Sequence, residues 1–222
     1  MAKQVKTVQV SPLFLDDDSI YTKIIKDLMS GVFVAGDRLV TTKLSERYNT
    51  SVNPVREALK QLQGEGFVSV SPNSGARVTT FEYKDIRDVF EILQLLEPYL
   101  LEWFVQEHTS EHKKVLYSLL EQMENNCEGD HETYRNLDTQ FHWLLYSQHY
   151  NKSAIELWRH KRLVLQIMHA NTPLSQSRTK QSLSEHKAIV AAIENCDVET
   201  ALTVLKTHIA GSGKYWSRHN QD

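Results

Sequence analysis

The stretch TTKLSERYNTSVNPVREALKQLQGEG, residues 41–66, decides the fold of this chain. Its first part has the composition of a short helix, and the polar turn at 49–51 ends it. A second helix then begins with Pro54 in its first turn, where the missing N–H of proline is no loss. The apolar face of this second helix consists of residues at helical spacing: Val55, Leu59 and Leu62. The pattern predicts a helix–turn–helix pair.

The segments on either side extend this pair into a small domain. Before it, DDDSIYTKIIKDLMSG (16–31) has apolar residues at helical spacing, with Asp18 or Ser19 as its cap. After it, FVSV (67–70) and ARVTT (76–80) are rich in strand-forming residues and flank the turn-forming sequence SPNSG. This part of the chain therefore predicts a helix, a helix–turn–helix and a β-hairpin, which together make a winged helix.

After Phe81 the pattern becomes helical throughout, without a further strand or repeat. Helices are expected at 82–107, 110–127, 130–148, 151–170, 182–194 and 197–216. Their candidate caps are Asp85, Ser110, Ser182 and Asp197. The fold class is mainly α, with an N-terminal winged helix-turn-helix and a C-terminal all-α bundle. The expected domains are a flexible arm at 1–15, the winged helix at 16–80 and the bundle at 81–222.

Composition bounds the location and the partners of the protein. The 222 residues carry a formal net charge of −3, and the charge is uneven. Residues 1–80 hold ten Lys/Arg and eight Asp/Glu, whereas 81–222 hold fifteen and twenty. A more basic N-terminal part suits binding to nucleic acid. No apolar run approaches the roughly 20 residues that span a bilayer, and no secretory signal is evident, so we expect a cytoplasmic protein without a membrane partner.

The exposed start of the second helix is the candidate DNA-binding site. A helix in the major groove reads bases chiefly with its N-terminal residues, and the surrounding contacts go to phosphates. The candidate residues are Thr42, Lys43, Ser51, Asn53, Pro54, Arg56, Ser74, Gly75 and Arg77. The alternative is an ordinary capped helix with surface Arg and Lys. The hairpin that follows at once, with glycine at its tip, favours double-stranded DNA as a partner.

A second group of polar residues lies in the helical part. Asp138 and His142 are four residues apart and share one helix face, close enough to hold one metal ion. His186 and His208 each fall on the apolar stripe of a later helix and are expected to face inward. Any one of these histidines can equally be a hydrogen-bonded core residue. A joint Asp/His site of mixed nitrogen and oxygen donors suits Zn²⁺, Ni²⁺, Mn²⁺ or Fe²⁺.

The N-terminal part resembles the winged-helix domain of GntR-family transcription regulators. The resemblance covers about residues 18–80 and is carried by PVREAL and EGFV, in a family pattern close to LGVSRTPVREAL and EGLV. It implies a dimer that presents two recognition helices to a palindromic operator. Where the family usually has an arginine after the serine, this chain has Val52, followed by Asn53. Asn53 can read adenine instead, so the operator of relatives should not be carried over.

The helical part resembles the FCD ligand-sensing domain of the fatty-acid-regulator branch of that family, over about residues 82–215. Many such domains bind a metal and a small effector. The resemblance assigns the metal to matching positions of this chain: Asp138, His142, His186 and His208. In FEILQLLE, Leu93 replaces the arginine that often pairs with an effector carboxylate, and Gln94 lies beside it. Arg135, one turn before Asp138, is a candidate substitute and can equally be a solvated surface residue.

These observations favour a ligand-responsive, sequence-specific transcription regulator, with repression as the expected effect. It is expected to be a homodimer that binds a divalent metal and a small effector, for which a carboxylate-bearing molecule is one candidate, and not an enzyme. Two alternatives stay open. One is a metal-dependent enzyme, since three histidines and an aspartate can activate water. The other is a regulator that responds to metal alone, which Leu93 favours.

Overall fold

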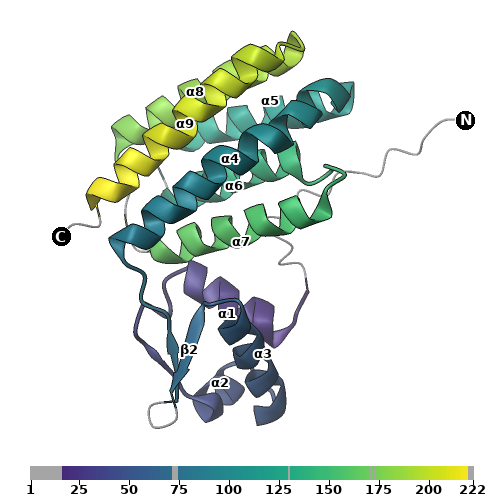
Figure 1. Ribbon diagram of the computed structural model, residues 1–222. Coiled ribbons are helices and arrows are strands. Elements are labelled where there is room, and N and C mark those ends of the chain that lie inside the picture. Colours follow the sequence, from purple (N-terminus) through teal and green to yellow (C-terminus); the bar gives the residue numbers. More distant parts are fainter. Residues whose placement is uncertain (1–16, 72–74, 130, 171, 173, 220–222) are drawn as a thin grey trace, which may run out of the picture. The chain divides into compact units, whose positions relative to one another are not determined.

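A computed structural model describes residues 17–71, 75–129, 131–170, 172 and 174–219. The arm expected at 1–15 lies outside this part of the chain. The helices are α1 (Ile20–Met29), α2 (Thr41–Arg47), α3 (Val52–Gly64), α4 (Tyr83–Glu107), α5 (Ser110–Asn126), α6 (His131–Tyr146), α7 (Lys152–Met168), α8 (Gln176–Glu194) and α9 (Val198–His219). The strands are β1 (Arg38–Leu39), β2 (Val68–Ser71) and β3 (Gly75–Val78). The mainly helical fold class predicted from the sequence is confirmed (Figure 1).

Two compact units divide the described chain. One holds residues 17–86 together with 162–172, and the other holds 87–161 and 174–219. Within the described residues, no helix is both long and apolar enough to cross a membrane.

The first unit is a winged helix built on helix α3. Ser51 is the N-cap residue of α3. The buried face of this helix consists of Val55, Ala58, Leu59 and Leu62. The helix ends where Gly66 takes a φ of +83°, a conformation that glycine adopts without steric cost. There the N–H of Phe67 donates to the carbonyl oxygen of Leu62 at 2.9 Å, and both side chains are buried. This helix stop turns the chain directly into the sheet.

The sheet of this unit has three antiparallel strands in the order β1-β3-β2, where the sequence predicted only the β2-β3 hairpin. β1 escaped prediction because it has only two residues. Its register places Arg38 opposite Arg77 and Leu39 opposite Ala76. Leu39 is buried and Arg38 is exposed, so one face of the sheet covers the core and the other faces solvent.

The second unit is an α-helical bundle. α8 and α9 pack against each other as a hairpin, while α5 packs on both α6 and α8. α9 begins at a cap predicted from the sequence, because Asp197 Oδ1 accepts a hydrogen bond from the N–H of Thr200 at 3.0 Å. The turn before this cap places Cys196 at a φ of +53°. α5 is capped by Thr109, one residue before the predicted Ser110.

One predicted helix start is wrong. α8 begins at Gln176 rather than at Ser182, because the hydroxyl of Ser175 accepts a hydrogen bond from the N–H of Arg178 and caps the helix there. The sequence had predicted no helix between residues 170 and 182. Ser182 instead lies buried inside α8. This earlier start brings Arg178 onto the same helix as His186, which matters for the site described next.

Candidate metal centre and DNA-binding face

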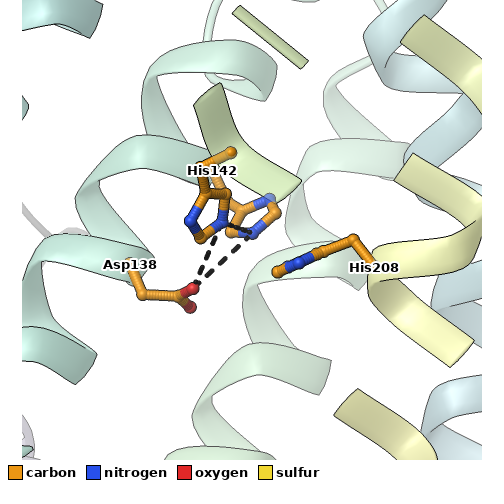
Figure 2. Close-up of side chains that lie close together, drawn as sticks. Asp138, His142 and His208 are labelled. Atoms are coloured by element: carbon orange, nitrogen blue, oxygen red, sulfur yellow. Dashed lines mark hydrogen bonds and ion pairs between the residues drawn. The ribbon is translucent and has the colours of Figure 1, made fainter. Parts of the chain in front are cut away.

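Four predicted ligands come together inside the helical unit (Figure 2). Asp138 and His142 come from α6, His186 from α8 and His208 from α9. Their donor atoms, one from each residue, all lie within 4.8 Å of one another. The three histidines are buried, and the Asp138 side chain is 19% exposed. Asp138 is therefore the most exposed of the four ligands.

The separations of the donor atoms suit one metal ion. His186 Nε2 lies 3.3 Å from His142 Nε2 and 3.4 Å from Asp138 Oδ1. His142 Nε2 lies 3.9 Å from the same carboxylate oxygen. Ligands bound at about 2.1 Å around a single ion are roughly 3 to 4 Å apart, so these three donors fit one ion with little movement. Three imidazole nitrogens and one carboxylate oxygen are donors that divalent transition metals accept.

A chain of polar contacts supports the His208 side chain. Its Nδ1 lies 2.7 Å from Glu185 Oε2, so this nitrogen carries the proton and Nε2 keeps a lone pair. Arg178 Nη2 donates to the same oxygen at 3.2 Å and to the Ser212 hydroxyl at 2.8 Å. Burial opposes ionisation of Glu185, but hydrogen bonds from His208 and Arg178 outweigh it and lower the pKa of Glu185 to about 2. Glu185 is therefore an anion at neutral pH.

A buried carboxylate also lies behind His142. The Tyr146 hydroxyl lies 3.3 Å from His142 Nδ1 and donates to Glu97 Oε2 at 3.1 Å. Glu97 Oε1 accepts from the indole N–H of Trp158 at 2.9 Å. Glu97 is 1% exposed, which explains why both of its oxygens are hydrogen-bonded. Helices α4, α6 and α7 are thus tied to one another next to this ligand.

The third histidine is held differently. His186 is fully buried against the ring of Phe141, and its Nδ1 has no hydrogen-bond partner among the described residues. Burial lowers the pKa of His186 to about 3, and the positive charge of Arg178 acts in the same direction. The ring is therefore neutral at physiological pH, which is the form that binds a metal.

The predicted effector residues differ in their exposure to solvent. Leu93, at the position of the family's usual arginine, is 1% exposed on α4. Gln94 beside it is exposed, so the structure does not bring its side chain into the cluster. Arg135 lies on α6 and is partly exposed. The buried cation that sequence reasoning missed is Arg178, because it precedes residue 182, where the helix was predicted to begin.

The predicted DNA-binding residues lie at the starts of α2 and α3 and on the sheet. Ser51 makes no side-chain cap hydrogen bond, which leaves its hydroxyl available. The exposed residues of the predicted set are Thr42, Lys43, Ser51, Asn53, Pro54, Arg56 and Arg77. Gly75, with a φ of +73°, begins β3, and Ser74 lies outside the described residues. Within the described part, Lys43, Asn53 and Arg56 make no side-chain hydrogen bond or ion pair, so binding DNA would break no internal contact.

Comparison with known proteins gives matches along most of the chain. Residues 17–78 match the family model "Bacterial regulatory proteins, gntR family", and residues 88–211 match the FCD domain model. The HTH-type transcriptional regulator YdhC of Bacillus subtilis is 26% identical over 191 residues, which is 85% of each chain. The galactonate operon transcriptional repressor of Escherichia coli is 24% identical over 216 residues, covering 88% of this chain and 94% of the repressor.

A solved structure agrees with the fold. That of E. coli McbR/YncC superposes with a TM-score of 0.81, covering 90% of this chain and 97% of that one. At 21% identity this likeness bears on the fold alone.

Proposed function

The chain belongs to the GntR family of bacterial regulatory proteins and carries an FCD domain, and from this premise we propose that it is an effector-responsive repressor with a metal-containing sensor domain. DNA-binding transcription regulation is the activity of the family. The metal-dependent enzyme is no longer a competing reading, because the matching family and its curated relatives are transcription regulators. We take 16–80 and 81–222 as the bounds of the two domains, with a cytoplasmic location beside the genome.

In this proposal a homodimer binds a palindromic operator through two copies of α3. Asn53 and Arg56 suit base edges in the major groove, since asparagine pairs with adenine and arginine with guanine. Ser51 and Lys43 suit the phosphates on either side of the helix. Their exposure leaves all four side chains available to DNA. Replacing a residue that contacts bases changes the sequence specificity, whereas replacing one that contacts phosphates weakens binding to all sequences alike.

The convergence of the four donor atoms within 4.8 Å is the observation that carries the metal proposal. We propose that Asp138, His142, His186 and His208 hold one Zn²⁺, Ni²⁺, Mn²⁺ or Fe²⁺ ion. When bound, such an ion supplies a Lewis-acidic centre to which a carboxylate can coordinate. The protein orients the donors: Glu185 fixes the proton on one nitrogen of His208, and burial keeps His186 neutral.

A small carboxylate-bearing molecule is the proposed effector. One relative is named for a galactonate operon, and galactonate is a sugar-acid carboxylate. Arg135 stays the candidate for its second contact, while exposed Gln94 is a weaker one. The second candidate function is regulation by metal alone, and buried Leu93 favours it because no cation stands at the family's usual effector position.

Selection of binding sites from a random duplex pool tests the DNA proposal. Wild-type protein and Arg56→Ala are compared with and without a metal chelator. A short palindrome enriched only by wild type supports a dimeric, sequence-specific regulator. Absence of any enriched sequence in either condition contradicts the proposal. Repeating the binding with added sugar acids separates the two modes: release by an acid in the presence of metal supports an organic effector, and release by chelation alone supports the metal-only regulator.

A further inference from the structure

The solvent face of the winged-helix sheet carries two arginines side by side. The register pairs Arg38 of β1 with Arg77 of β3, and Arg77 in turn with Ser69 of β2. All three are exposed, while the neighbouring positions Leu39 and Val78 are buried. The alternation of a strand therefore puts both guanidinium groups on the outer face. Sequence reasoning selected Arg77 but not Arg38, because the two-residue strand β1 is not visible in the sequence.

The two side chains extend toward opposite ends of the sheet. Arg77 Nη1 donates to the carbonyl oxygen of Gly36 at 2.8 Å, so it lies over the turn before β1. Arg38 extends toward Gly75 instead: a Cβ on that glycine would be 3.7 Å from Arg38 Nε and 3.8 Å from its Nη2. The absence of a side chain at Gly75 leaves the guanidinium of Arg38 uncovered at the base of the wing. The two charges thus form a short row along the face.

Nothing in the described part of the chain neutralises Arg38. Its guanidinium makes no hydrogen bond or ion pair with the described residues, and the adjacent carboxylate of Asp37 accepts the N–H of Val34 at 2.9 Å. Like charges directly opposite each other on neighbouring strands destabilise a sheet. The pair therefore does not by itself stabilise the folded domain. An anion placed against this face would remove the repulsion and use donors that are already exposed.

We propose that Arg38 binds a phosphate of the DNA backbone, as the neighbour of a phosphate contact made by Arg77. This inference rests on the proposed DNA-binding function and adds a residue to it. A duplex backbone offers repeated phosphates, and a planar guanidinium pairs with phosphate oxygens through two N–H groups. Because such a contact carries no base information, Arg38 adds affinity without altering the preferred sequence.

A salt series on the full-length chain tests the assignment. Binding of wild type, Arg38→Ala and Arg38→Lys is measured by fluorescence anisotropy on the selected duplex and on a scrambled duplex. Lys114→Ala is the control, since it removes one exposed positive charge from α5, far along the chain from the wing. Thermal unfolding confirms that each variant is folded. Loss of one phosphate contact lowers the slope of log K against log salt by about 0.9.

When the salt concentration is raised from about 50 to 200 mM, the affinity of wild type for DNA should fall by a factor about 3.5 times larger than that of Arg38→Ala. Both duplexes should be weakened by the same factor, and Arg38→Lys should keep the wild-type slope. A slope for Arg38→Ala equal to that of wild type and Lys114→Ala would overturn the proposal, as would a loss confined to the selected duplex. If Arg56→Ala loses sequence preference while Arg38→Ala behaves as wild type, DNA binding stands and only the Arg38 assignment fails. If wild type binds neither duplex, the proposed DNA-binding function and the Arg38 assignment both fail.

Discussion

Replacing Glu185 by glutamine tests how the candidate metal centre is held. The substitution keeps the size of the side chain but removes the charge that faces Arg178 and His208. Arg178 is 7% exposed, so it would be left as a buried cation without its carboxylate. The fall in the pKa of Glu185 from 4.5 to about 2 corresponds to about 3 kcal/mol of folding free energy. Because glutamine still offers a hydrogen-bond acceptor, we expect a loss of about 2 kcal/mol.

The same substitution should lower the affinity of the site for the metal ion. Glutamine can donate to His208 Nδ1 as well as accept from it, so the lone pair is no longer confined to Nε2. Loss of such a supporting carboxylate typically lowers metal affinity by about 10- to 100-fold. Urea unfolding in the presence of chelator measures the first effect, and competition with a chromophoric chelator at low urea measures the second. Glu124→Gln is the matched control, because its ion pair with Lys187 is exposed.

The pH dependence of stability gives an independent check. A carboxylate whose folded-state pKa is depressed stabilises the protein fully above its usual pKa of 4.5 and loses that contribution as the pH falls toward 2. The stability difference between wild type and Glu185→Gln should therefore be constant near neutral pH and narrow below about pH 4.5. A variant with wild-type stability and wild-type metal affinity would refute the reasoning. Lower stability with unchanged metal affinity would limit Glu185 to a structural ion pair.

Other substitutions follow from the same structure. His186→Ala should lower the metal content measured by mass spectrometry after dialysis, and full occupancy would show that the ligand set is wrong. Arg56→Ala should reduce affinity for the selected duplex more than for a scrambled one, by about tenfold for one base contact, in a gel-shift assay. Gly213→Ala should destabilise the protein by about 1 kcal/mol, because its Cβ would lie 3.2 Å from Phe90 Cγ, while Gly64→Ala meets no atom within 4 Å and should raise the melting temperature.

Spacing along single helices explains what could be predicted. Asp138 and His142 are one turn apart on α6, so any straight helix brings them together. His186 and His208 each fall on an apolar stripe, and stripes face the core. The start of α3 was visible from a proline in the first turn of an apolar repeat. These features depend on the spacing of residues within one helix, and the packing of the helices does not change that spacing.

The supporting residues could not be predicted because they act across helices. Glu185 is next to His186 in the sequence, yet it serves His208 on α9. Adjacent helical residues point about 100° apart, so a neighbour in sequence is seldom a partner in space. Glu97 likewise reaches Tyr146 and Trp158 from a different helix. Only the packing of the bundle decides these pairs.

The buried face of α4 bears on how an effector would be recognised. Leu93 and Glu97 are one turn apart and both are 1% exposed, so they face the interior together. Glu97 is already tied to Tyr146 and Trp158 beside His142, and position 93 offers only methyl groups. A carboxylate entering here would find no side-chain cation at position 93 of α4, and burying it unpaired would be costly. An ion held among Asp138 and the histidines would be the buried positive group that meets this charge, with Arg135 as the candidate for a second contact. Effector binding would then depend on the metal more strongly than in a relative that keeps the arginine.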